Sequence, residues 1–250
     1  SFPEIQHILV RHEQGAAHAA DGYSRATGKV GVCLATSGPG ATNLVTGLAT
    51  AMSDSIAMVA ITGQVKRDLI GNDAFQEADV TGICRPVTKH CYLLKDLRHL
   101  PRLVKEAFFI ARTGRPGPVL IDFPRDLQAE KYTGPIDVEI DLPGYKPPVE
   151  PRAEQIEAAA EAINSAERPV FFVGGGCVIS GAYRELRAVI ERVNAPATCT
   201  LMALGALPGN HPLSMGMAGM HGTIYANYAM NNCDLMISIG ARFDDRVTGR

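Results

Sequence analysis

The chain has 250 residues, of which 46% are hydrophobic and 20% charged, and its net charge is −2. A folded body of this length buries roughly 70–75% of its unfolded surface, so it needs no disulfide or structural metal. The near-neutral charge disfavours a nucleic-acid partner, which calls for a basic face. The longest apolar stretch, residues 56–62, is too short to span a bilayer. The six cysteines form no C-x-x-C pair, which is typical of reduced thiols in a cytosol-like compartment.

The first half of the chain alternates short apolar runs with helical stretches. We expect strands at 5–10, 30–36, 56–62 and 118–123, and helices at 13–26, 41–52 and 97–113. Strands that are apolar on both faces and are separated by helices indicate a parallel sheet covered on both sides. The predicted fold is therefore a doubly wound α/β domain over residues 1–131.

A proline-rich segment at 132–152 breaks this pattern and reads as an extended linker. A second α/β series follows over 153–250, with helices at 153–165 and 180–193 and strands at 169–173, 197–201 and 234–239. This series is short of the usual five or six strands, so we expect the second domain to be truncated.

Two segments of the first half place polar groups where a strand ends and a helix begins. Glu13 lies at such a point, and ligands bind at the carboxyl ends of strands in open α/β sheets. Burial there would raise its pKa, although Glu13 could equally favour the dipole of its own helix. The loop 36–43 (TSGPGATN) has two glycines that allow a flat ligand to approach the backbone, or that simply make a tight turn.

The second half has three comparable segments. Gly174–Gly176 follow a strand and resemble a dinucleotide turn, but Ile179 stands where the third glycine of G-x-G-x-x-G would be. The segments 219–223 (GMHGT) and 240–246 (GARFDDR) add polar and flexible groups at further loop or strand ends. The seven histidines have no repeated spacing and give no metal or triad signature.

These segments together resemble the large catalytic subunit of the acetolactate synthase (acetohydroxyacid synthase) family, which depends on thiamine diphosphate. The resemblance extends over essentially the whole chain. The runs that carry it are RHEQGAA (11–17), ATSGPGATN (35–43), AITGQV (60–65), DAFQE (73–77), GRPGP (114–118), GMHGT (219–223) and GARFDDRVTG (240–249).

The resemblance implies a fold and a reaction. Residues 1–131 would be the pyrimidine-binding domain and 153–250 a Rossmann-like FAD-binding central domain. The enzyme would decarboxylate pyruvate and join the two-carbon unit to a second 2-keto acid, pyruvate or 2-ketobutyrate, in branched-chain amino-acid biosynthesis. Glu13 would hydrogen-bond the pyrimidine N1′ and favour the imino tautomer, whose nitrogen removes the thiazolium C2 proton.

The resemblance also implies roles for other residues. Pro39, Asn43 and Gln76 would lie by the aminopyrimidine or the substrate, Phe75 would wall the reaction pocket, and Arg246 would pair with the acceptor carboxylate. The expected FAD contacts are Arg115, Gly174, Gly175, Gly176, Thr200, Leu201, Met220, His221, Gly222, Thr223, Gly240, Arg242 and Asp244.

The family's third domain holds Mg²⁺ and the diphosphate through a Gly-Asp-Gly…Asn-Asn motif, which this sequence does not contain. We therefore expect a fragment that is inactive alone and belongs to a homodimer or larger assembly, with active sites between subunits and a possible small regulatory subunit. The sequence leaves two alternatives open. One is a related carboligase or decarboxylase, such as glyoxylate carboligase, and the other is a non-catalytic flavin-binding or regulatory module.

Overall fold

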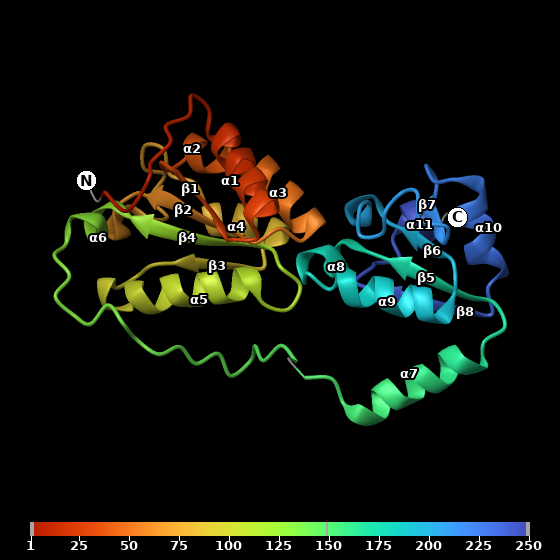
Figure 1. The fold of residues 1–250 in the computed structure, drawn as a ribbon. Coiled ribbons are helices and arrows are strands. Elements are labelled where there is room, and N and C mark those ends of the chain that lie inside the picture. The colour runs from red at the N-terminus through yellow and green to blue at the C-terminus, as the bar shows by residue number, and fades with distance from the viewer. Residues whose placement is uncertain (1–2, 149, 249–250) are drawn as a thin grey trace. The chain divides into compact units, whose positions relative to one another are not determined.

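The structure is a computed structural model that describes residues 3–148 and 150–248. The chain divides into two compact units, Ser1–Pro148 and Val149–Arg250, and each is built on its own parallel sheet. Figure 1 shows the elements of both units. None of the described helices is both long and apolar enough to cross a membrane.

The first unit has a four-stranded sheet in the order β1-β2-β4-β3, and all its neighbouring strands are parallel. The strands are β1 (Gly31–Ala35), β2 (Met58–Gln64), β3 (His90–Leu93) and β4 (Pro118–Pro124). The helices are α1 (Glu13–Thr27), α2 (Pro39–Thr42), α3 (Val45–Asp54), α4 (Val80–Cys84), α5 (Leu100–Arg112) and α6 (Arg125–Ala129), with 3-10 turns η1 (Arg67–Leu69), η2 (Arg85–Val87) and η3 (Leu97–His99).

Helices cover both faces of this sheet, as expected for a parallel sheet. Met58 and Ala60 of β2 face the cluster formed with α1 and α3, whereas Val59 and Ile61 face α5. The two faces alternate because successive side chains of a strand point to opposite sides. Figure 1 shows α1 and α3 above the sheet and α5 below it. The predicted doubly wound arrangement of the first half is confirmed to this extent.

Small residues allow α1 to lie very close to the sheet. A Cβ on Gly31 of β1 would stand 2.1 Å from the carbonyl oxygen of Ala20, and one on Gly47 of α3 would stand 2.4 Å from Cβ of Ala17. Gly28 ends α1 with φ +70°, and its N–H donates to Ser24 O. The packing thus fixes where Glu13, the first residue of α1, is presented.

In the first half one predicted strand is wrong, one strand was not predicted, and one predicted helix is divided. The apolar run 5–10 is no strand, and Leu9 is 84% exposed, because no described strand pairs with it and a strand is stable only within a ladder. The sequence analysis also missed β3, whose residues HCYL have no run of β-branched side chains. The expected helix 41–52 is divided into α2 and α3.

The second unit has another parallel four-stranded sheet, in the order β7-β6-β5-β8. Its strands are β5 (Pro169–Val173), β6 (Ala197–Cys199), β7 (Ser214–Met217) and β8 (Leu235–Ile239). Its helices are α7 (Ala153–Ser165), α8 (Gly175–Ile179), α9 (Tyr183–Val193), α10 (Ile224–Asn232) and α11 (Asp245–Thr248), with a 3-10 turn η4 (Leu201–Ala203). The predicted strands at 169–173 and 234–239 are confirmed, and β7 and α10 were missed.

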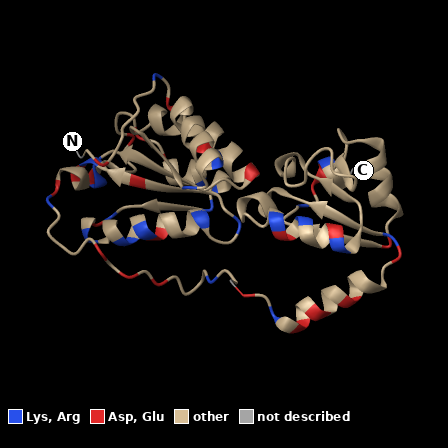
Figure 2. Ribbon diagram, viewed as in Figure 1, with Lys and Arg blue, Asp and Glu red and all other residues tan. Residues whose placement is uncertain are grey.

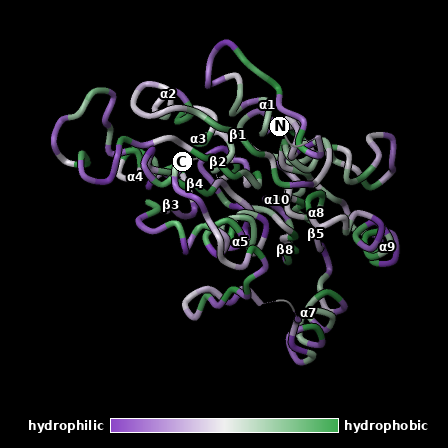
Figure 3. Tube along the Cα trace, turned by 90° about the vertical axis from the view of Figure 1, so that its left-hand side faces the viewer, coloured by the Kyte–Doolittle hydropathy of each residue, from purple (hydrophilic) through white to green (hydrophobic). Residues whose placement is uncertain are grey.

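The core of the second unit also has two faces. Phe171 and Val173 pack with Ile190 of α9, whereas Phe172 packs with Ala226 of α10. The predicted helix 153–165 is confirmed as α7, but none of its residues is buried. In Figure 3 α7 alternates between hydrophobic and hydrophilic residues along its length.

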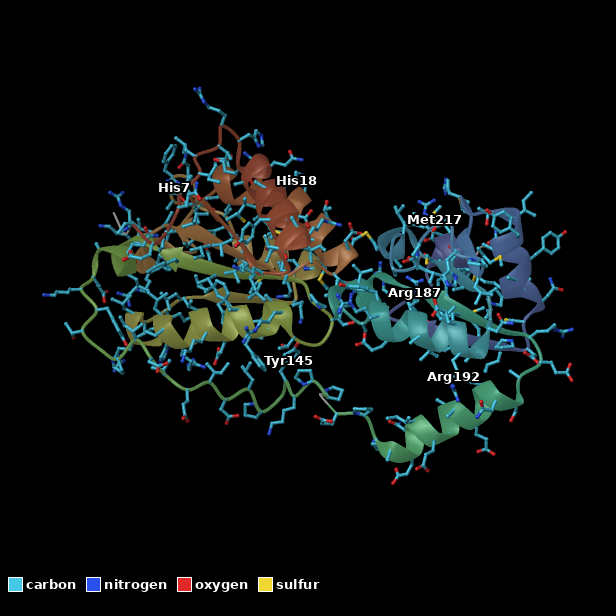
Figure 4. All side chains as sticks on the ribbon, in the orientation of Figure 1. His7, His18, Tyr145, Arg187, Arg192 and Met217 are labelled. Carbon is cyan, nitrogen blue, oxygen red and sulfur yellow. The ribbon has the colours of Figure 1, made fainter. Side chains whose placement is uncertain are left out.

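Segment 132–152 has no helix or strand among its described residues, but one of its side chains is held on the first unit. The ammonium of Lys89 donates to the hydroxyl oxygen of Tyr145 at 2.9 Å, and that hydroxyl donates to Thr113 O at 2.7 Å. Figure 4 labels Tyr145 between the segment and α5. The segment predicted as a linker is therefore anchored to the first unit at this residue.

Candidate functional site

The carboxyl ends of the strands in the first unit bring Glu13 and the loop 36–43 together. The side-chain amide of Asn43 donates to Oε2 of Glu13 at 3.0 Å. His12 caps α1, because its Nδ1 accepts the N–H of Gln14 at 3.1 Å. Two motifs that are thirty residues apart in the sequence thus meet at one hydrogen bond.

The environment of Glu13 differs from the buried setting that the sequence predicted. Its carboxylate is partly exposed, and its pKa is lowered, not raised. The largest cause is the hydrogen bond from the Asn43 amide, followed by its own backbone N–H, and burial only partly opposes them. In this structure Glu13 is therefore a partly exposed carboxylate whose Oε2 is held by Asn43.

Two glycines let the loop 36–43 lie against its neighbours. Gly38 has φ +60°, and a Cβ there would stand 2.5 Å from the carbonyl oxygen of Gln76. A Cβ on Gly40 would stand 2.7 Å from Cγ2 of Thr36 and 3.4 Å from Oε1 of Glu13. Pro39 begins α2, a position where its missing N–H costs nothing. The glycines of this loop thus serve close approach within the protein.

The loop 71–77 is the third part of this edge, and the carboxylate of Glu77 organises it. Oε2 of Glu77 accepts the N–H of Ala74 at 2.9 Å, and Oε1 accepts the N–H of Gly71. These backbone donors, that of Gly71 first, lower the pKa of Glu77. The loop carries Gln76, whose φ is +59°, and Phe75, which is 89% exposed. Both predicted residues therefore lie in a loop that presents them away from the core.

The sequence analysis missed a buried polar group on the same edge. Asp122 of β4 is only 1% exposed, and it accepts hydrogen bonds from Thr62 and Gln64 of β2. The sequence does contain a sign of Asp122, which is the single acidic residue in the apolar run PVLIDFP. A carboxylate there needs compensating donors, because burying an unpaired charge is very costly.

In the second unit the four strand ends carry most of the expected flavin residues. Gly174–Gly176 follow β5, Thr200 and Leu201 follow β6, Met220–Thr223 lie just beyond β7, and Gly240 and Arg242 follow β8. Parallel strands place their carboxyl ends on one edge, so these segments share an edge of the sheet. Leu201, Met220 and His221 are exposed there.

The glycines after β5 are explained by packing between strand ends. A Cβ on Gly174 would stand 2.1 Å from the carbonyl oxygen of Gly240, and a Cβ on Gly176 would stand 2.8 Å from its Cα. The N–H groups of Gly174, Gly176 and Cys177 donate to Ile239 O, Gly240 O and Gly174 O. These three donors are therefore engaged within the protein, unlike those of a turn that cradles a diphosphate.

The other expected residues of this unit are also tied into its backbone. The N–H of Met220 donates to Arg246 O at 2.7 Å, and Thr223 caps α10 by accepting the N–H of Ala226. Oδ1 of Asp244 accepts the N–H of Arg246 at 3.1 Å. The side chain of Arg246 is 67% exposed, and its Nε lies 3.9 Å from Oδ2 of Asp245, which is also exposed.

Arg115 lies in the first unit, unlike the other expected flavin residues. Its guanidinium donates to Oγ of Ser55 at 2.8 Å and to Met52 O at 3.0 Å. Phe75 and Arg246, both expected to contact substrate, likewise belong to different units. Among the described residues no group of three or more His, Cys, Asp or Glu side chains is placed to hold a metal ion.

Comparison with known proteins gives this arrangement of two parallel-sheet units a family. Residues 1–83 match the N-terminal TPP binding domain of thiamine pyrophosphate enzymes, and residues 156–250 match their central domain. The chain belongs to the thiamine pyrophosphate enzyme family.

Within that family the chain is similar to acetolactate synthases. It is 55% identical over 249 residues to the acetolactate synthase large subunit of Corynebacterium glutamicum, a match that covers 100% of this chain and 40% of the relative. A probable acetolactate synthase large subunit of Methanocaldococcus jannaschii is 55% identical, with 98% and 42% covered. Acetolactate synthase 1, chloroplastic, of Zea mays is 53% identical, with 99% and 39% covered. The chain thus spans about 40% of the length of these relatives.

Proposed function

We propose that this chain supplies the pyrimidine-binding part and the central part of an acetolactate synthase. The enzyme would decarboxylate pyruvate on thiamine diphosphate and transfer the two-carbon unit to a second 2-keto acid. The observation that carries this proposal is the hydrogen bond between Glu13 and Asn43, which joins two of the motifs shared with that family.

Glu13 has the chemistry that an aminopyrimidine requires. When bound, thiamine diphosphate supplies the electron sink for decarboxylation. The carboxylate of Glu13 would accept or share a proton at the ring nitrogen N1′, while Asn43 holds Oε2 and leaves Oε1 facing Gly40. A ring laid over the carboxylate would remove water from it and raise its pKa, which favours proton sharing. The lowered pKa of Glu13 in the free chain is compatible with that role.

The loop residues would shape the rest of the pocket. Phe75 is an exposed aromatic ring on a loop fixed by Glu77, and such a ring can exclude water from a reacting centre. Gln76 and Pro39 flank the contact between Gly38 and the loop 71–77, where the pyrimidine or substrate would lie. Arg246 would pair with the carboxylate of the acceptor keto acid.

The second unit fits a Rossmann-like flavin domain in one respect and not in another. The strand order β7-β6-β5-β8 reverses between β5 and β8, and dinucleotides bind outside such a switch point. The amides of Gly174 and Gly176 do not fit a diphosphate, because they are already engaged. FAD would therefore rely on residues after β6 and β7, with Arg242, Asp244 and Arg115.

Mg²⁺ and partners are the remaining parts of the proposal. The described residues offer no ligand set for Mg²⁺. The diphosphate and its metal would be held by the part of the enzyme that this chain does not match. We further propose that the active enzyme is a homodimer or larger, with a possible small regulatory subunit.

A graft tests the proposal. The matched 249-residue segment of the Corynebacterium glutamicum relative would be replaced by this chain, and acetolactate formation from pyruvate measured. We expect an active graft, and we expect Glu13→Gln within it to lower the rate by about 10²-fold or more with unchanged flavin content. Glu4→Gln, at an exposed position, is the matched control. Near-normal activity of the Glu13→Gln graft would refute the role of Glu13, and a folded but inactive unsubstituted graft would refute the proposed function.

A further inference from the structure

Asp122 lies at the carboxyl end of β4, buried between two donors from the neighbouring strand. Asp122 pairs with Thr62 in the sheet register, so its side chain lies on the same face as those of Thr62 and Gln64. The hydroxyl of Thr62 donates to Oδ1 of Asp122 at 2.7 Å, and Nε2 of Gln64 donates to Oδ2 at 2.8 Å. Figure 2 shows the acidic residue of β4 as red on an otherwise uncharged strand.

Gln64 connects this carboxylate to the loop that carries the candidate site residues. Nε2 of Gln64 also donates to the carbonyl oxygen of Ala78 at 3.0 Å, and Oε1 accepts the N–H of Val65 at 2.8 Å. The amide thus uses two donors and one acceptor. Ala78 directly follows the loop 71–77 and precedes α4.

The carboxylate acts together with two backbone groups to fix the orientation of this amide. An ionised carboxylate only accepts hydrogen bonds, so it selects the Nε2 side of Gln64. The same orientation directs Nε2 to Ala78 O and Oε1 to the N–H of Val65. A group that could also donate, such as an amide or a protonated carboxyl, would no longer help to select this orientation, so that only Ala78 O and the N–H of Val65 would hold the Gln64 amide against a flip.

The surroundings make Asp122 costly to keep ionised. Burial raises its pKa to about 6, the hydrogen bonds from Thr62 and Gln64 oppose this, and the charge of Asp79, the cap of α4, adds to it. The thiols of Cys84 and Cys91 also lie within its electrostatic reach, and Arg85 lies near Cys91. A buried carboxylate such as Asp122, whose ionisation at neutral pH costs free energy, is a candidate for a functional role.

We propose that Asp122 is a positioning residue, which orients the amide of Gln64 and through it anchors the loop 71–77 that presents Phe75 and Gln76. The contact of Gly38 with Gln76 then fixes the loop against the segment that bears Asn43. The positioning is a property of this chain alone. Only the use of the loop in catalysis rests on the proposed function.

Hydrogen exchange of the 250-residue chain, followed by mass spectrometry, tests the positioning. At pH 7 we expect Asp122→Asn to speed the exchange of peptides that cover residues 66–80 by about tenfold, since one anchoring hydrogen bond is lost. Thr62→Val removes the other bond to the same carboxylate and leaves that to Gln64, so at a pH well above the pKa of Asp122 it should leave this exchange unchanged. Unchanged loop exchange in Asp122→Asn would overturn the proposal.

Glu106→Gln is the control for a general loss of stability. Glu106 is also 1% exposed and bonded, to the hydroxyl of Tyr92 and to Arg102, but it lies on α5 at the opposite face. We expect its variant to affect α5 peptides only. If it speeds loop exchange as much as Asp122→Asn does, the loop responds to stability and the proposal fails.

A pH series adds a readout that a merely structural role would not move. After correction for the intrinsic pH dependence, loop exchange in the unsubstituted chain should increase as the pH falls through about 6, because protonated Asp122 no longer selects one amide orientation. Asp122→Asn should show no such step, and a step of equal size there would contradict the proposal. These exchange measurements need no cofactor, so their outcome does not depend on whether the graft is active.

Discussion

In each unit the carboxyl ends of the strands form one edge of its own parallel sheet, and the contacts at that edge differ between the units. In the first unit, side chains make the connections at the strand ends: Asn43 to Glu13, and Gln64 to Asp122. In the second, the segments that follow β5 and β8 meet backbone to backbone at glycines, as where the N–H of Gly176 donates to Gly240 O. Side chains at a sheet edge can orient a proton-transferring group. Closely packed glycine backbone instead fixes the shape of a surface against which a ligand can lie. The predictions below test this contrast.

Substitution of Gly174 should have the largest effect. An alanine Cβ would stand 2.1 Å from the carbonyl oxygen of Gly240, so β5 and β8 would have to separate at their ends. We expect Gly174→Ala to lower the free energy of unfolding of the second unit by about 3 kcal/mol, measured by urea unfolding with circular dichroism. Gly209→Ala is the control, since nothing lies within 4 Å of its Cβ. Equal stability of the two variants would show that the contact between Gly174 and Gly240 is not tightly packed.

The pH dependence of stability should reveal Asp122 in the first unit. Because its pKa is raised from 3.8 to about 6, the folded chain binds this proton more readily than the unfolded chain. Its contribution therefore favours folding at low pH and is lost as the pH rises from about 4 to 6, at a cost of roughly 2–3 kcal/mol. The stability difference between Asp122→Asn and the unsubstituted chain should grow in favour of the variant over that range, as measured by urea unfolding at each pH. A constant difference would argue against a buried, ionised Asp122.

Removal of the Asn43 amide should change the titration of Glu13. Asn43→Ala eliminates the largest cause of its lowered pKa, so the pKa should rise toward its ordinary value. The measurement is an NMR titration of the ¹³C-labelled glutamate carboxyl. Asn227→Ala, which removes the amide that bonds Gly219 in the second unit, should leave Glu13 unchanged. An unchanged pKa of Glu13 in Asn43→Ala would show that the Asn43 amide does not determine the titration of Glu13.

The smallest effect is expected for a side-chain pair of the second unit. Glu191 accepts hydrogen bonds from Arg187 and His211, but the pair with Arg187 is about half exposed. Figure 4 labels Arg187 on α9. We expect Glu191→Gln to change the free energy of unfolding by less than about 0.5 kcal/mol, by urea unfolding. A loss above 1 kcal/mol would mean that this half-exposed group contributes more to stability than a surface ion pair normally does.

Much of the fold could be predicted from local pattern. The apolar runs of β2, β4, β5 and β8 are long or bulky enough to mark buried parallel strands by themselves. The four-residue strands β3 and β7 could not be found this way, because HCYL and SMGM become strands only through pairing with β4 and β6. The strand that was wrongly predicted at 5–10 has the same explanation, since an apolar run without a partner strand stays irregular.

The sequence by itself determined the two-unit α/β architecture and the family, because periodicity and shared motifs are written locally along the chain. It also supplied Glu13, Asn43 and Gln76 as candidate residues. Only the tertiary structure decided their environment: the pKa of Glu13 is lowered by an amide thirty residues away, and Asp122 is buried against Gln64. Hydrogen bonds and desolvation depend on which groups meet in space, and that is settled by packing between elements, not by any one of them.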